Sequence, residues 1–377
     1  MKKKVVILQE YVPQYRVSFF DTLADLASSE DIELVVAAGQ PNGSLAGRGD
    51  NANPPYVLPI RQREFAIGQK RIVIRNVRKA TAKADLVIME QARRNLDAYR
   101  LLLPRFFRQR MWALWGHGRD YVEHKSKFSA WLQSVLTSRA DWFFAYTSGG
   151  ARHVEGLGFS SGKITTVMNS LDTTAMRQGL KAASPTLADF RSTHGLQSKI
   201  ATFIGALDES KRISFLLHSL QRLSADHPNV SFVIAGDGPL RDKVRAVTEK
   251  LPNVHAIGRV DGEAKYALLS LSNVLLVPGR VGLIAVDSLA AGVPIVTTRW
   301  EYHAPEFEYL EEDVSCVCSD NSVEAYSESV SGLILDDERR IFLSDNCRSA
   351  GEHLSVEQMS RNFIEGVRRA LAKGGRG

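Results

Sequence analysis

Short runs of apolar residues alternate with helical spacing from one end of the chain to the other. Residues 5–8 and 32–38 are apolar runs of strand length, and residues 19–28 between them repeat their apolar positions with helical spacing. Further apolar runs follow at 86–89 and 142–146. Short buried strands that alternate with helices predict βαβ units, in which helices cover both faces of a parallel sheet.

A polar stretch at 180–195 interrupts this alternation, and the same pattern begins again after it. Two doubly wound α/β domains are therefore predicted, one over 1–180 and one over 181–354, facing each other across a cleft. Ligands of open parallel sheets bind at the carboxyl ends of the strands, so this cleft is the expected site.

The last segment, 355–377, has the spacing of an amphipathic helix. Its apolar residues recur at four-residue steps, at Met359, Phe363, Val367 and Leu371. We expect this helix to pack back on the body of the protein, on the N-terminal domain.

The composition is that of a globular protein, with 377 residues, 44% hydrophobic and 24% charged. No window approaches the roughly eighteen apolar residues of a membrane span, and the N-terminal segment is expected to be a first strand and not a signal peptide. Three cysteines without a C-x-x-C pair predict neither a disulfide framework nor a cysteine zinc site. We expect a cytoplasmic protein, with a peripheral position on the inner face of the plasma membrane as a further option.

Positive charge is concentrated in residues 61–125. This region holds 16 Lys or Arg against 6 acids, a local net charge of +10 in a chain whose total is +6. Such a field attracts anionic lipid, nucleic acid or an anionic substrate. A solvated basic face without a partner is the alternative.

The stretch VPGRVGLIAVDSLAAGVPIVTT, residues 277–298, predicts a strand, a glycine turn and a helix. Gly279 and Gly282 would let the backbone approach a ligand, and the helix is expected to begin within Val281, Gly282 and Leu283. The N–H groups at the start of such a helix bind phosphate, so a diphosphate is the expected ligand. Asp287 could bind a ribose hydroxyl of the same ligand. An ordinary turn is the alternative.

Two cations follow the strand that ends at Gly205. Lys211 and Arg212 are expected at the mouth of the second domain, near the start of a helix. There they would neutralise a leaving diphosphate without a metal ion. The alternative is a pair of exposed basic residues.

Taken in order, these segments resemble the donor-binding half of the family 4 glycosyltransferases, which have the GT-B fold. The resemblance rests on Gly205-Ala206-Leu207 with Lys211, on AGDGP at 235–239, and on P-G-x-V-G-L-x-x-x-D-S-L-x-x-G-x-P from Pro278. The N-terminal half agrees through WGHG at 115–118 and through Lys163-Ile164-x-x-Val167-Met168-Asn169-x-x-Asp172.

The resemblance implies a retaining transfer of a sugar from a nucleotide-diphosphate sugar, without a metal or another cofactor. The acceptor would be a polysaccharide, a glycolipid or a lipid-linked glycan, and the basic region 61–125 would meet anionic lipid. The implied donor contacts are Lys211 and residues 281–283 for the diphosphate, Asp287 for the ribose, and the loop at Arg259 for the base. His117 would face the donor sugar. Independently of the resemblance, Tyr15 and Arg16 follow the first strand where its loop meets the cleft, on the acceptor side, and could touch the acceptor or a phosphate.

Two departures from the family pattern stand in the donor half. The usual first Glu of the helix motif is Gly279 here, and the usual Arg before the Lys is Ala206. Arg212 or Arg280 could replace the lost cation. Glu306, in the segment His303-Ala304-Pro305-Glu306, could replace the lost carboxylate; that segment and P-G-x-V-G-L also resemble a subgroup of bacterial polysaccharide glycosyltransferases.

Three other functions stay open at this point. A nucleotide-sugar epimerase would keep the fold and change the reaction. A non-catalytic relative would bind the nucleotide sugar only, which the two departures would favour. A nucleic-acid-binding protein could use the basic face, but the sequence has no recognition motif of that class, so no nucleic-acid partner is expected.

Overall fold

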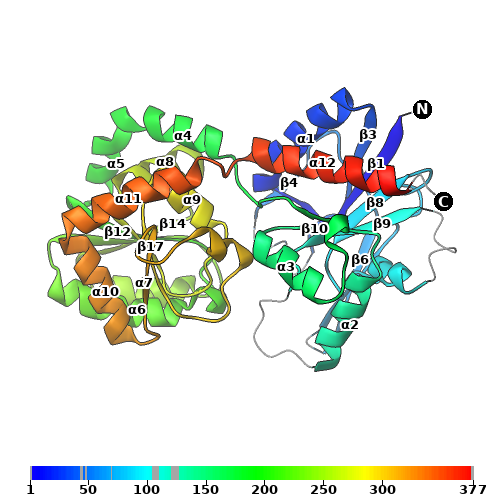
Figure 1. Ribbon diagram of the computed structural model, residues 1–377. Coiled ribbons are helices and arrows are strands. Elements are labelled where there is room, and N and C mark those ends of the chain that lie inside the picture. The colour runs from blue at the N-terminus through cyan, green and yellow to red at the C-terminus, as the bar shows by residue number, and fades with distance from the viewer. Residues whose placement is uncertain are drawn as a thin grey trace. The chain divides into compact units, whose positions relative to one another are not determined.

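The computed structural model describes residues 2–42, 46, 49–68, 70–103, 110–119 and 127–374 (Figure 1). Contacts divide the chain into two compact units, the first made of Met1–Leu171 and Val356–Gly377 and the second of Asp172–Ser355. Each unit is an α/β domain with its own parallel sheet. The predicted class of two doubly wound domains is confirmed.

Among the described residues, the sheet of the first unit has seven strands in the order β11-β10-β9-β8-β1-β3-β5, all paired in parallel. Its strands are β1 (Lys3–Gln9), β3 (Ile32–Ala38), β5 (Leu58–Pro59), β8 (Leu86–Glu90), β9 (Met111–Gly116), β10 (Trp142–Ala145) and β11 (Ile164–Thr166). The helical elements of this unit are η1 (Gln14–Arg16), α1 (Val17–Ser29), η3 (Leu96–Leu102), α2 (Lys127–Ser138), α3 (Ser148–Gly156), η5 (Ser161–Lys163) and α12 (Val356–Gly374). Two antiparallel pairs lie outside the sheet, β2 (Val12–Pro13) with β4 (Asn51–Ala52) and β6 (Gln62–Ile67) with β7 (Lys70–Arg75).

The first sheet separates two hydrophobic cores. Since successive side chains of a strand point to opposite faces, Val5 and Ile7 of β1 pack in the core beneath α1 and α12, and Val6 and Leu8 pack in the other. The C-terminal helix α12 completes the first core, where Phe363 stacks on Phe144 of β10 at 4.5 Å between ring centroids. The returning helix is therefore part of the first unit.

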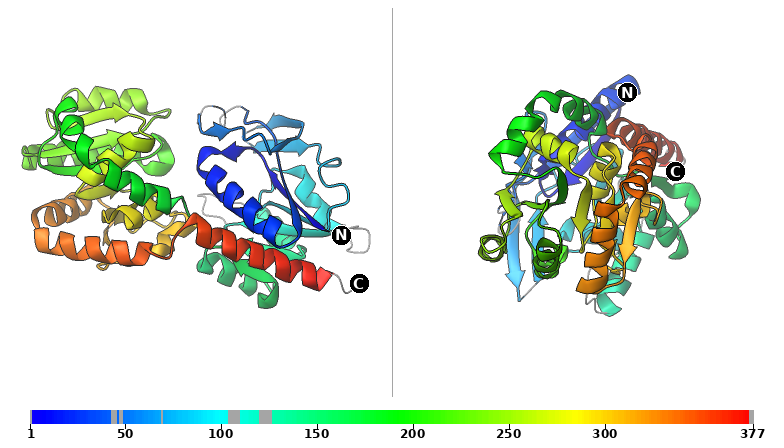
Figure 2. Two further views of the ribbon diagram at one scale, coloured as in Figure 1. Left: turned by 90° about the horizontal axis from the view of Figure 1, so that it is seen from above. Right: turned by 90° about the vertical axis from the view of Figure 1, so that its left-hand side faces the viewer.

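The sheet of the second unit has six described strands in the order β14-β13-β12-β15-β16-β17, again all parallel. Its strands are β12 (Lys199–Ile204), β13 (Val230–Ala235), β14 (Val254–Gly258), β15 (Val274–Val277), β16 (Ile295–Thr298) and β17 (Cys316–Ser319). Its helical elements are α4 (Thr173–Ala182), η6 (Ser184–Thr186), α5 (Leu187–Thr193), η7 (Glu209–Lys211), α6 (Ile213–Asp226), α7 (Arg241–Thr248), α8 (Gly262–Leu271), α9 (Ile284–Ala291), η8 (Pro305–Tyr309), α10 (Val323–Leu335) and α11 (Asp337–Gly351). Helices lie on both faces of this sheet (Figure 2).

The strand order places a functional crevice in the second unit. The chain winds from β12 outward to β13 and β14, then returns to the other side of β12 with β15. Ligands of open α/β sheets bind where the winding direction reverses, outside the carboxyl ends of the two strands. The loops that follow β12 and β15 meet at this point, and they are the two segments singled out by the sequence motifs.

Two element boundaries differ from the sequence predictions. Helix α4 lies in the second unit, although the boundary at 180 placed it in the first domain. It packs on α8, where the absence of a side chain at Gly179 leaves room for the ring of Tyr266. The polar stretch 180–195 also contains a helix, α5, because Leu187 and Phe190 pack against a buried cluster of this unit.

Candidate functional site

The loops after β12 and β15 are joined by direct hydrogen bonds. The Arg280 N–H donates to the Ser210 carbonyl oxygen at 2.9 Å, and the Lys211 ammonium donates to the Arg280 carbonyl oxygen at 2.6 Å. Gly205, which follows β12, donates its N–H to the Ala235 carbonyl oxygen at 3.0 Å. The two sequence motifs therefore form one structure at the switch point of the sheet.

Gly279 is the point of closest approach between these loops. A Cβ atom built on Gly279 would lie 2.5 Å from the carbonyl carbon of Lys211 and 2.6 Å from its carbonyl oxygen. Real Cβ atoms do not approach backbone atoms this closely, so no side chain fits without movement of the Lys211 segment. Glycine at this position thus permits the close approach of the two loops.

Lys211 is a partly buried amine inside this arrangement. Burial lowers its pKa to about 8, and the nearby Arg280 lowers it further, while the charges of Asp208 and Glu306 oppose the shift. The side chain is still a cation at neutral pH. It can therefore stabilise a bound anion, and its charge is lost within the mildly alkaline range.

The turn before α9 offers fewer N–H groups than the sequence predicted. Helix α9 begins at Ile284, later than the predicted start within 281–283. The Val281 N–H donates to His303 Nδ1 at 3.2 Å, so it is already used. No described residue accepts a hydrogen bond from the N–H of Gly282 or Leu283. These two groups, next to the helix start, are the ones that a phosphate could use.

His303 holds this turn in place, a role that the sequence analysis missed. Its ring is 6% exposed, Nδ1 accepts from Val281, and Nε2 lies 2.9 Å from the Thr298 carbonyl oxygen. With Nδ1 as acceptor, Nε2 must carry the proton and donate it. Burial lowers the pKa of His303 to about 4, which keeps the ring neutral. The sequence signal was present, since His303 is part of the segment quoted for Glu306.

Arg212 is hydrogen-bonded to the loop that follows β15 and to its neighbours. Its Nη1 donates to the Pro278 carbonyl oxygen, to Thr298 Oγ1 and to Asn321 Oδ1, at 3.1, 3.1 and 2.6 Å. The guanidinium also lies 4.2 Å from the ring centroid of Phe215. Arg212 therefore fixes the loop after β15 from within the second unit, and its expected diphosphate contact stays a prediction.

Two carboxylates lie beside the loops. Asp287, on the first turn of α9, is 5% exposed, and both of its oxygens accept from the Lys265 ammonium at 2.8 Å. Glu306, in η8, is buried, and its charge raises the pKa of Lys211. The structure thus brings Glu306 near Lys211, whereas it gives Asp287 a partner on α8 that the sequence analysis did not identify.

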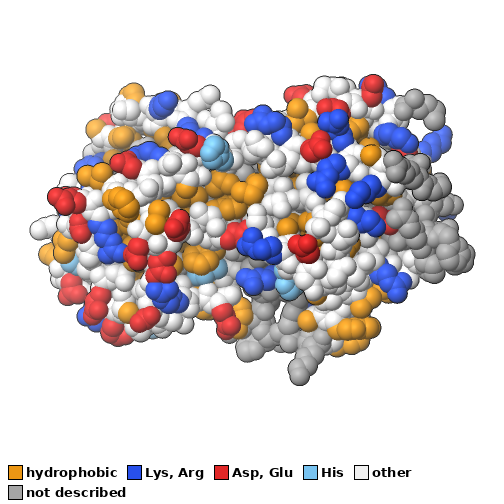
Figure 3. All heavy atoms as spheres, in the orientation of Figure 1, with side chains coloured by type: hydrophobic (Ala, Val, Ile, Leu, Met, Phe, Trp, Pro, Cys, Tyr) orange, Lys and Arg blue, Asp and Glu red, His pale blue; other side chains and the backbone are white. Residues whose placement is uncertain are grey.

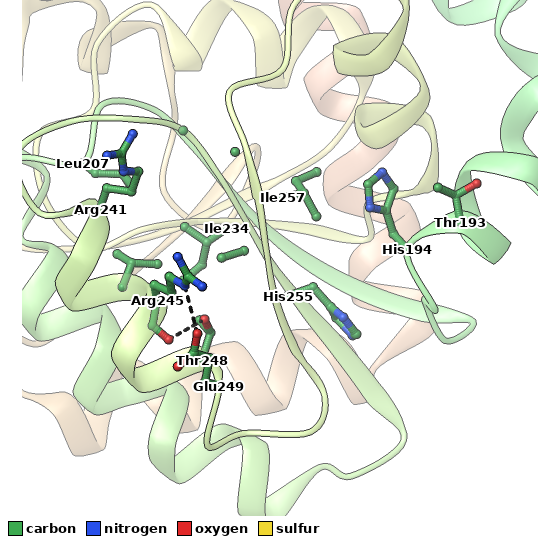
Figure 4. Close-up of a pocket in the computed structure, with 14 residues that line it drawn as sticks. Thr193, His194, Leu207, Ile234, Arg241, Arg245, Thr248, Glu249, His255 and Ile257 are labelled. Atoms are coloured by element: carbon green, nitrogen blue, oxygen red, sulfur yellow. Dashed lines mark hydrogen bonds and ion pairs between the residues drawn. The ribbon is translucent and has the colours of Figure 1, made fainter.

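A cavity of about 620 Å³ opens beside the loops that follow β12, β13 and β14 (Figure 4). Leu207, Gly236 and Gly258 line it at the carboxyl ends of these strands. Arg241 and Arg245 approach from α7, and His194 lies on the other side. Arg259 lies just past Gly258, is exposed, and pairs with Asp261 at 2.7 Å. The volume is in the range of small-molecule sites.

In the first unit, His117 follows β9 and is held by its neighbours. Its ring contacts Tyr146 edge to face at 4.8 Å. The next residue, Gly118, exchanges two hydrogen bonds with the Gln91 side chain, at 2.9 and 3.1 Å. Gly118 has φ of +80° and lies against the Gly150 carbonyl at the start of α3, so only glycine fits there.

The two predicted acceptor-side residues have different surroundings. Tyr15 is exposed. Arg16 is 3% exposed, donates to Asn169 Oδ1 at 2.5 Å, and lies 5.0 Å from the ring centroid of Trp115. An enclosed guanidinium of this kind stabilises the first unit, and the acceptor contact expected of Arg16 stays a prediction.

A charged network at the ends of β1 and β8 was not predicted. Glu10 is buried and pairs with Arg71 and Arg94, and its N–H donates to Glu90 at 2.9 Å. Burial and the charge of Glu10 raise the pKa of Glu90 to about 7. These residues are far apart in sequence, so no local motif could reveal the network.

The described residues hold neither a cluster of metal-ligand side chains nor a membrane-spanning helix. In this part of the chain, no three His, Cys, Asp or Glu side chains lie together as metal ligands would. None of the described helices combines the length and the apolar character that crossing a membrane requires. The expectation of a reaction without a metal stays a prediction.

Comparison with known proteins identifies a matching family model and relatives that match about a third of the chain. The family model described as glycosyl transferases group 1 matches residues 187–350. The chain is 29% identical over 132 residues to a glycogen synthase of Mycobacterium tuberculosis, covering 33% of this chain and 31% of that protein. It is 32% identical over 126 residues to the D-rhamnosyltransferase WbpZ of Pseudomonas aeruginosa, covering 32% and 31%. The chain spans about a third of the length of these curated relatives.

Solved structures share the fold over the whole chain. A glycosyltransferase from Rickettsia africae superposes with a TM-score of 0.72 at 13% identity, covering 99% of both chains. Anabaena Alr3699/HepE in complex with UDP-glucose superposes with a TM-score of 0.68 at 14% identity, covering 97% of this chain and 99% of that one. At such identities the similarity shows the fold alone.

Proposed function

We propose a sugar-transfer reaction for this chain, whose residues 187–350 belong to the glycosyl transferases group 1 and whose fold is GT-B. A nucleotide-diphosphate sugar is the donor, and a polysaccharide, a glycolipid or a lipid-linked glycan is the acceptor. The observation that carries the proposal is the joined pair of loops at the switch point, where the Lys211 ammonium and the turn before α9 lie together.

These loops suit the charge that develops during sugar transfer. The bond between the anomeric carbon and the diphosphate oxygen breaks, the acceptor hydroxyl oxygen bonds to that carbon, and the hydroxyl proton passes to the leaving diphosphate or to water. Lys211 and the N–H groups of Gly282 and Leu283 would stabilise the negative charge on the diphosphate. A fixed ammonium can do this without a metal ion, so we propose a metal-independent reaction. Retention of configuration is proposed from the family resemblance.

The rest of the donor follows from the same position. The cavity beside Gly258 would hold the base, and Asp287 would bind the ribose while remaining paired with Lys265. Arg280 and Glu306 remain proposed contacts to the diphosphate and the sugar, and His117 remains the proposed sugar contact of the first unit. Since Anabaena HepE is described with UDP and UDP-glucose, UDP is the first nucleotide to test.

The acceptor is proposed to be presented at a membrane. The relatives include a D-rhamnosyltransferase and a mannosyltransferase named for phosphatidylinositol dimannoside, so glycan and lipid-linked acceptors are the classes to test. We also propose a cytoplasmic protein that reaches the inner face of the plasma membrane through the basic region 61–125.

Thermal unfolding with nucleotides tests the donor site. The protein is heated with UDP, GDP, dTDP, CMP and ADP in turn, and a ligand at about a hundred times its Kd adds about 2.7 kcal/mol of stability. Lys211→Ala should lose this gain, whereas Lys250→Ala, an exposed lysine of the same unit, should keep it. If no nucleotide stabilises the wild-type protein, the donor site is absent and the proposal fails. If the bound nucleotide sugar is converted to its isomer without an acceptor, the reaction is an epimerisation.

A further inference from the structure

Exposed hydrophobic side chains of the first unit are concentrated on three elements, the β6–β7 hairpin, η3 and α2. The large hydrophobic residues exposed there or directly after η3, which we call the apolar strip, are Phe65, Ile74, Leu96, Leu102, Leu103, Phe128 and Trp131. Helix η3 packs against both β7 and α2, so the three elements are neighbours. Several exposed apolar side chains on neighbouring elements are typical of an interaction surface.

Helix α2 carries the most exposed part of the strip. Its inner side packs Leu136 in a core of the first unit, with Leu132 against that core. Phe128 and Trp131 lie one turn apart on the outer side, 67% and 58% exposed, with ring centroids 5.7 Å apart. Hydrophobic side chains gather over α2 in Figure 3. Among the described residues, neither ring belongs to a hydrophobic core of the first unit, so both are available to a partner.

The hairpin has a similar division of its two faces. Residues directly opposite each other in an antiparallel pair share a face. Glu64 and Val73 form an opposite pair on the inner face, where Glu64 lies 3.5 Å from Arg71. The next pair, Arg63 with Ile74, is exposed on the outer face. The outer face therefore presents apolar and cationic groups together.

The charges around the strip have one sign at the surface. In residues 56–103 and 128–139, the described carboxylates Glu64, Asp85, Glu90 and Asp97 are all buried or partly buried. The exposed cations of the same ranges are Arg61, Arg63, Arg78, Lys79, Lys83, Arg94, Arg100 and Arg139. Asp97 is one example, because it pairs with Arg75 at 2.6 Å inside the unit and its carboxylate does not reach the surface. No acid is exposed among the described side chains of these ranges.

We infer that the apolar strip docks on an anionic lipid bilayer, with Phe128 and Trp131 inserted among the headgroups. Aromatic and leucine side chains gain from burial at the boundary of the acyl chains, and each Lys or Arg near an anionic surface adds attraction. This inference gives the membrane part of the proposed function its contact surface, and it rests on that proposal for the acceptor.

Other partners fit these features less well. Nucleic acids are bound by cations and stacking aromatics, which this surface also has, but they offer no apolar surroundings in which Ile74 and the leucines at η3 would be buried. A second copy of the chain would bring the same eight cations face to face, which opposes association. An acidic protein would match the charge, and it is one outcome of the test.

Vesicle sedimentation of the full chain tests the inference. Vesicles of equimolar phosphatidylcholine and phosphatidylglycerol are compared with pure phosphatidylcholine. Wild-type protein should sediment with the anionic vesicles, and added salt should weaken the binding. The double variant Phe128→Ser with Trp131→Ser should bind about tenfold more weakly or worse. Its control is Ile341→Ser with Phe342→Ser, two exposed residues of α11 in the second unit, which should bind as wild type.

Tryptophan quenching reports insertion directly. Trp131 is the one described tryptophan in the exposed class, so lipids brominated on their acyl chains should quench it most. Trp131→Phe should remove this quenching while vesicle binding persists. The inference is overturned if wild-type protein ignores anionic vesicles, if pure phosphatidylcholine binds equally well, if the α2 double variant binds unchanged, or if the strip is covered by self-association.

The test separates this inference from the proposed function. Nucleotide stabilisation is measured on the same α2 double variant, and it should be unchanged because the donor residues lie in the second unit. If the protein binds vesicles but no nucleotide, the proposed function is refuted and the membrane-docking surface is retained. If it binds nucleotide but no vesicles, only the membrane-docking surface is refuted.

Discussion

The backbone of Lys211 occupies the space that a side chain at Gly279 would need. The Cβ position of Gly279 lies 2.5 Å from the Lys211 carbonyl carbon, so the two loops fit together only with glycine at this point. The same contact brings the Lys211 ammonium to the Arg280 carbonyl oxygen. A departure from the family pattern is therefore part of the geometry that positions the proposed diphosphate cation.

Gly279→Glu, which restores the acid of the family pattern, should damage the protein. We expect a loss of about 1–3 kcal/mol in the free energy of unfolding, because the added Cβ forces the Lys211 segment to move. Nucleotide binding should weaken with it. Denaturant unfolding and nucleotide titration of the same sample measure both effects.

The matched control is Gly332→Ala in α10, where an added Cβ meets no atom within 4 Å. That change should be neutral or stabilise the protein by about 0.5–1 kcal/mol, since alanine favours helix. If Gly279→Glu proves as stable as wild type and binds nucleotide better, the steric account of the missing acid is incorrect.

Lys211 predicts a pH dependence of nucleotide binding. Its pKa of about 8 is below the ordinary value of 10.5, so the free protein loses this charge as pH rises past 8. Binding of a diphosphate requires the protonated amine, so affinity should fall by up to about tenfold per pH unit above that point. The fall ends at the higher pKa that the amine has in the complex.

Calorimetric titration near neutral pH and at alkaline pH tests this dependence. Lys211→Arg keeps its charge over the whole range and should bind with an affinity that changes little. An unchanged wild-type affinity across the same range would mean that Lys211 does not contact the diphosphate.

His303 predicts a loss of stability in acid. Its pKa is about 4 in the folded protein, below the ordinary 6.5, because its burial disfavours the charged ring. Between these values the unfolded chain binds a proton that the folded protein does not, so stability falls as pH drops from 6.5 to 4. The whole shift corresponds to about 3 kcal/mol.

His303→Asn isolates this effect. The asparagine can still accept from the Val281 N–H, and it does not titrate. The variant should be less stable than wild type at neutral pH, and the difference should shrink towards pH 4. His353→Asn, at an exposed histidine of the same unit, should leave the curve parallel to wild type. A wild-type protein with flat stability over this range would contradict the neutral buried ring.

Sequence patterns predicted the fold because strands and helices of a doubly wound sheet have local signatures. The apolar run 32–38 became β3, and the four-residue steps of the last segment became the buried side of α12. Contacts between segments that are far apart in the sequence have no such local signature. The contact of Gly279 with Lys211 joins two loops about seventy residues apart, and neither loop alone predicts it.

The candidate site shows the same limit. The sequence located Lys211 and Asp287 by motif, but it could not show that Arg212 fixes a neighbouring loop or that Lys265 pairs with Asp287. It placed Arg16 beside an acceptor because of its position after the first strand. Four aromatic rings lie around that guanidinium, those of Tyr15, Phe19, Trp115 and Tyr146. Only the folded chain brings them together.

Variants at Asp287 and Lys265 distinguish a role in ribose binding from a role in stability. If Asp287 binds a ribose hydroxyl, the nucleotide diphosphate should bind about tenfold more tightly than its 2′-deoxy analogue, as expected for a hydrogen bond to a charged group. Asp287→Ala should abolish this preference. It also leaves the partly exposed Lys265 without its partner, at a cost of about 1 kcal/mol in the free energy of unfolding.

Lys265→Met provides the comparison, since it removes the ion pair and keeps the carboxylate. The variant should lose stability because Asp287 is left buried without its cation, yet it should retain the preference for the ribonucleotide. Calorimetric titration with the two analogues measures the preference, and denaturant unfolding measures the stability. If Asp287→Ala keeps the preference for the ribonucleotide, the carboxylate serves only to join α8 to α9, and the ribose is bound elsewhere.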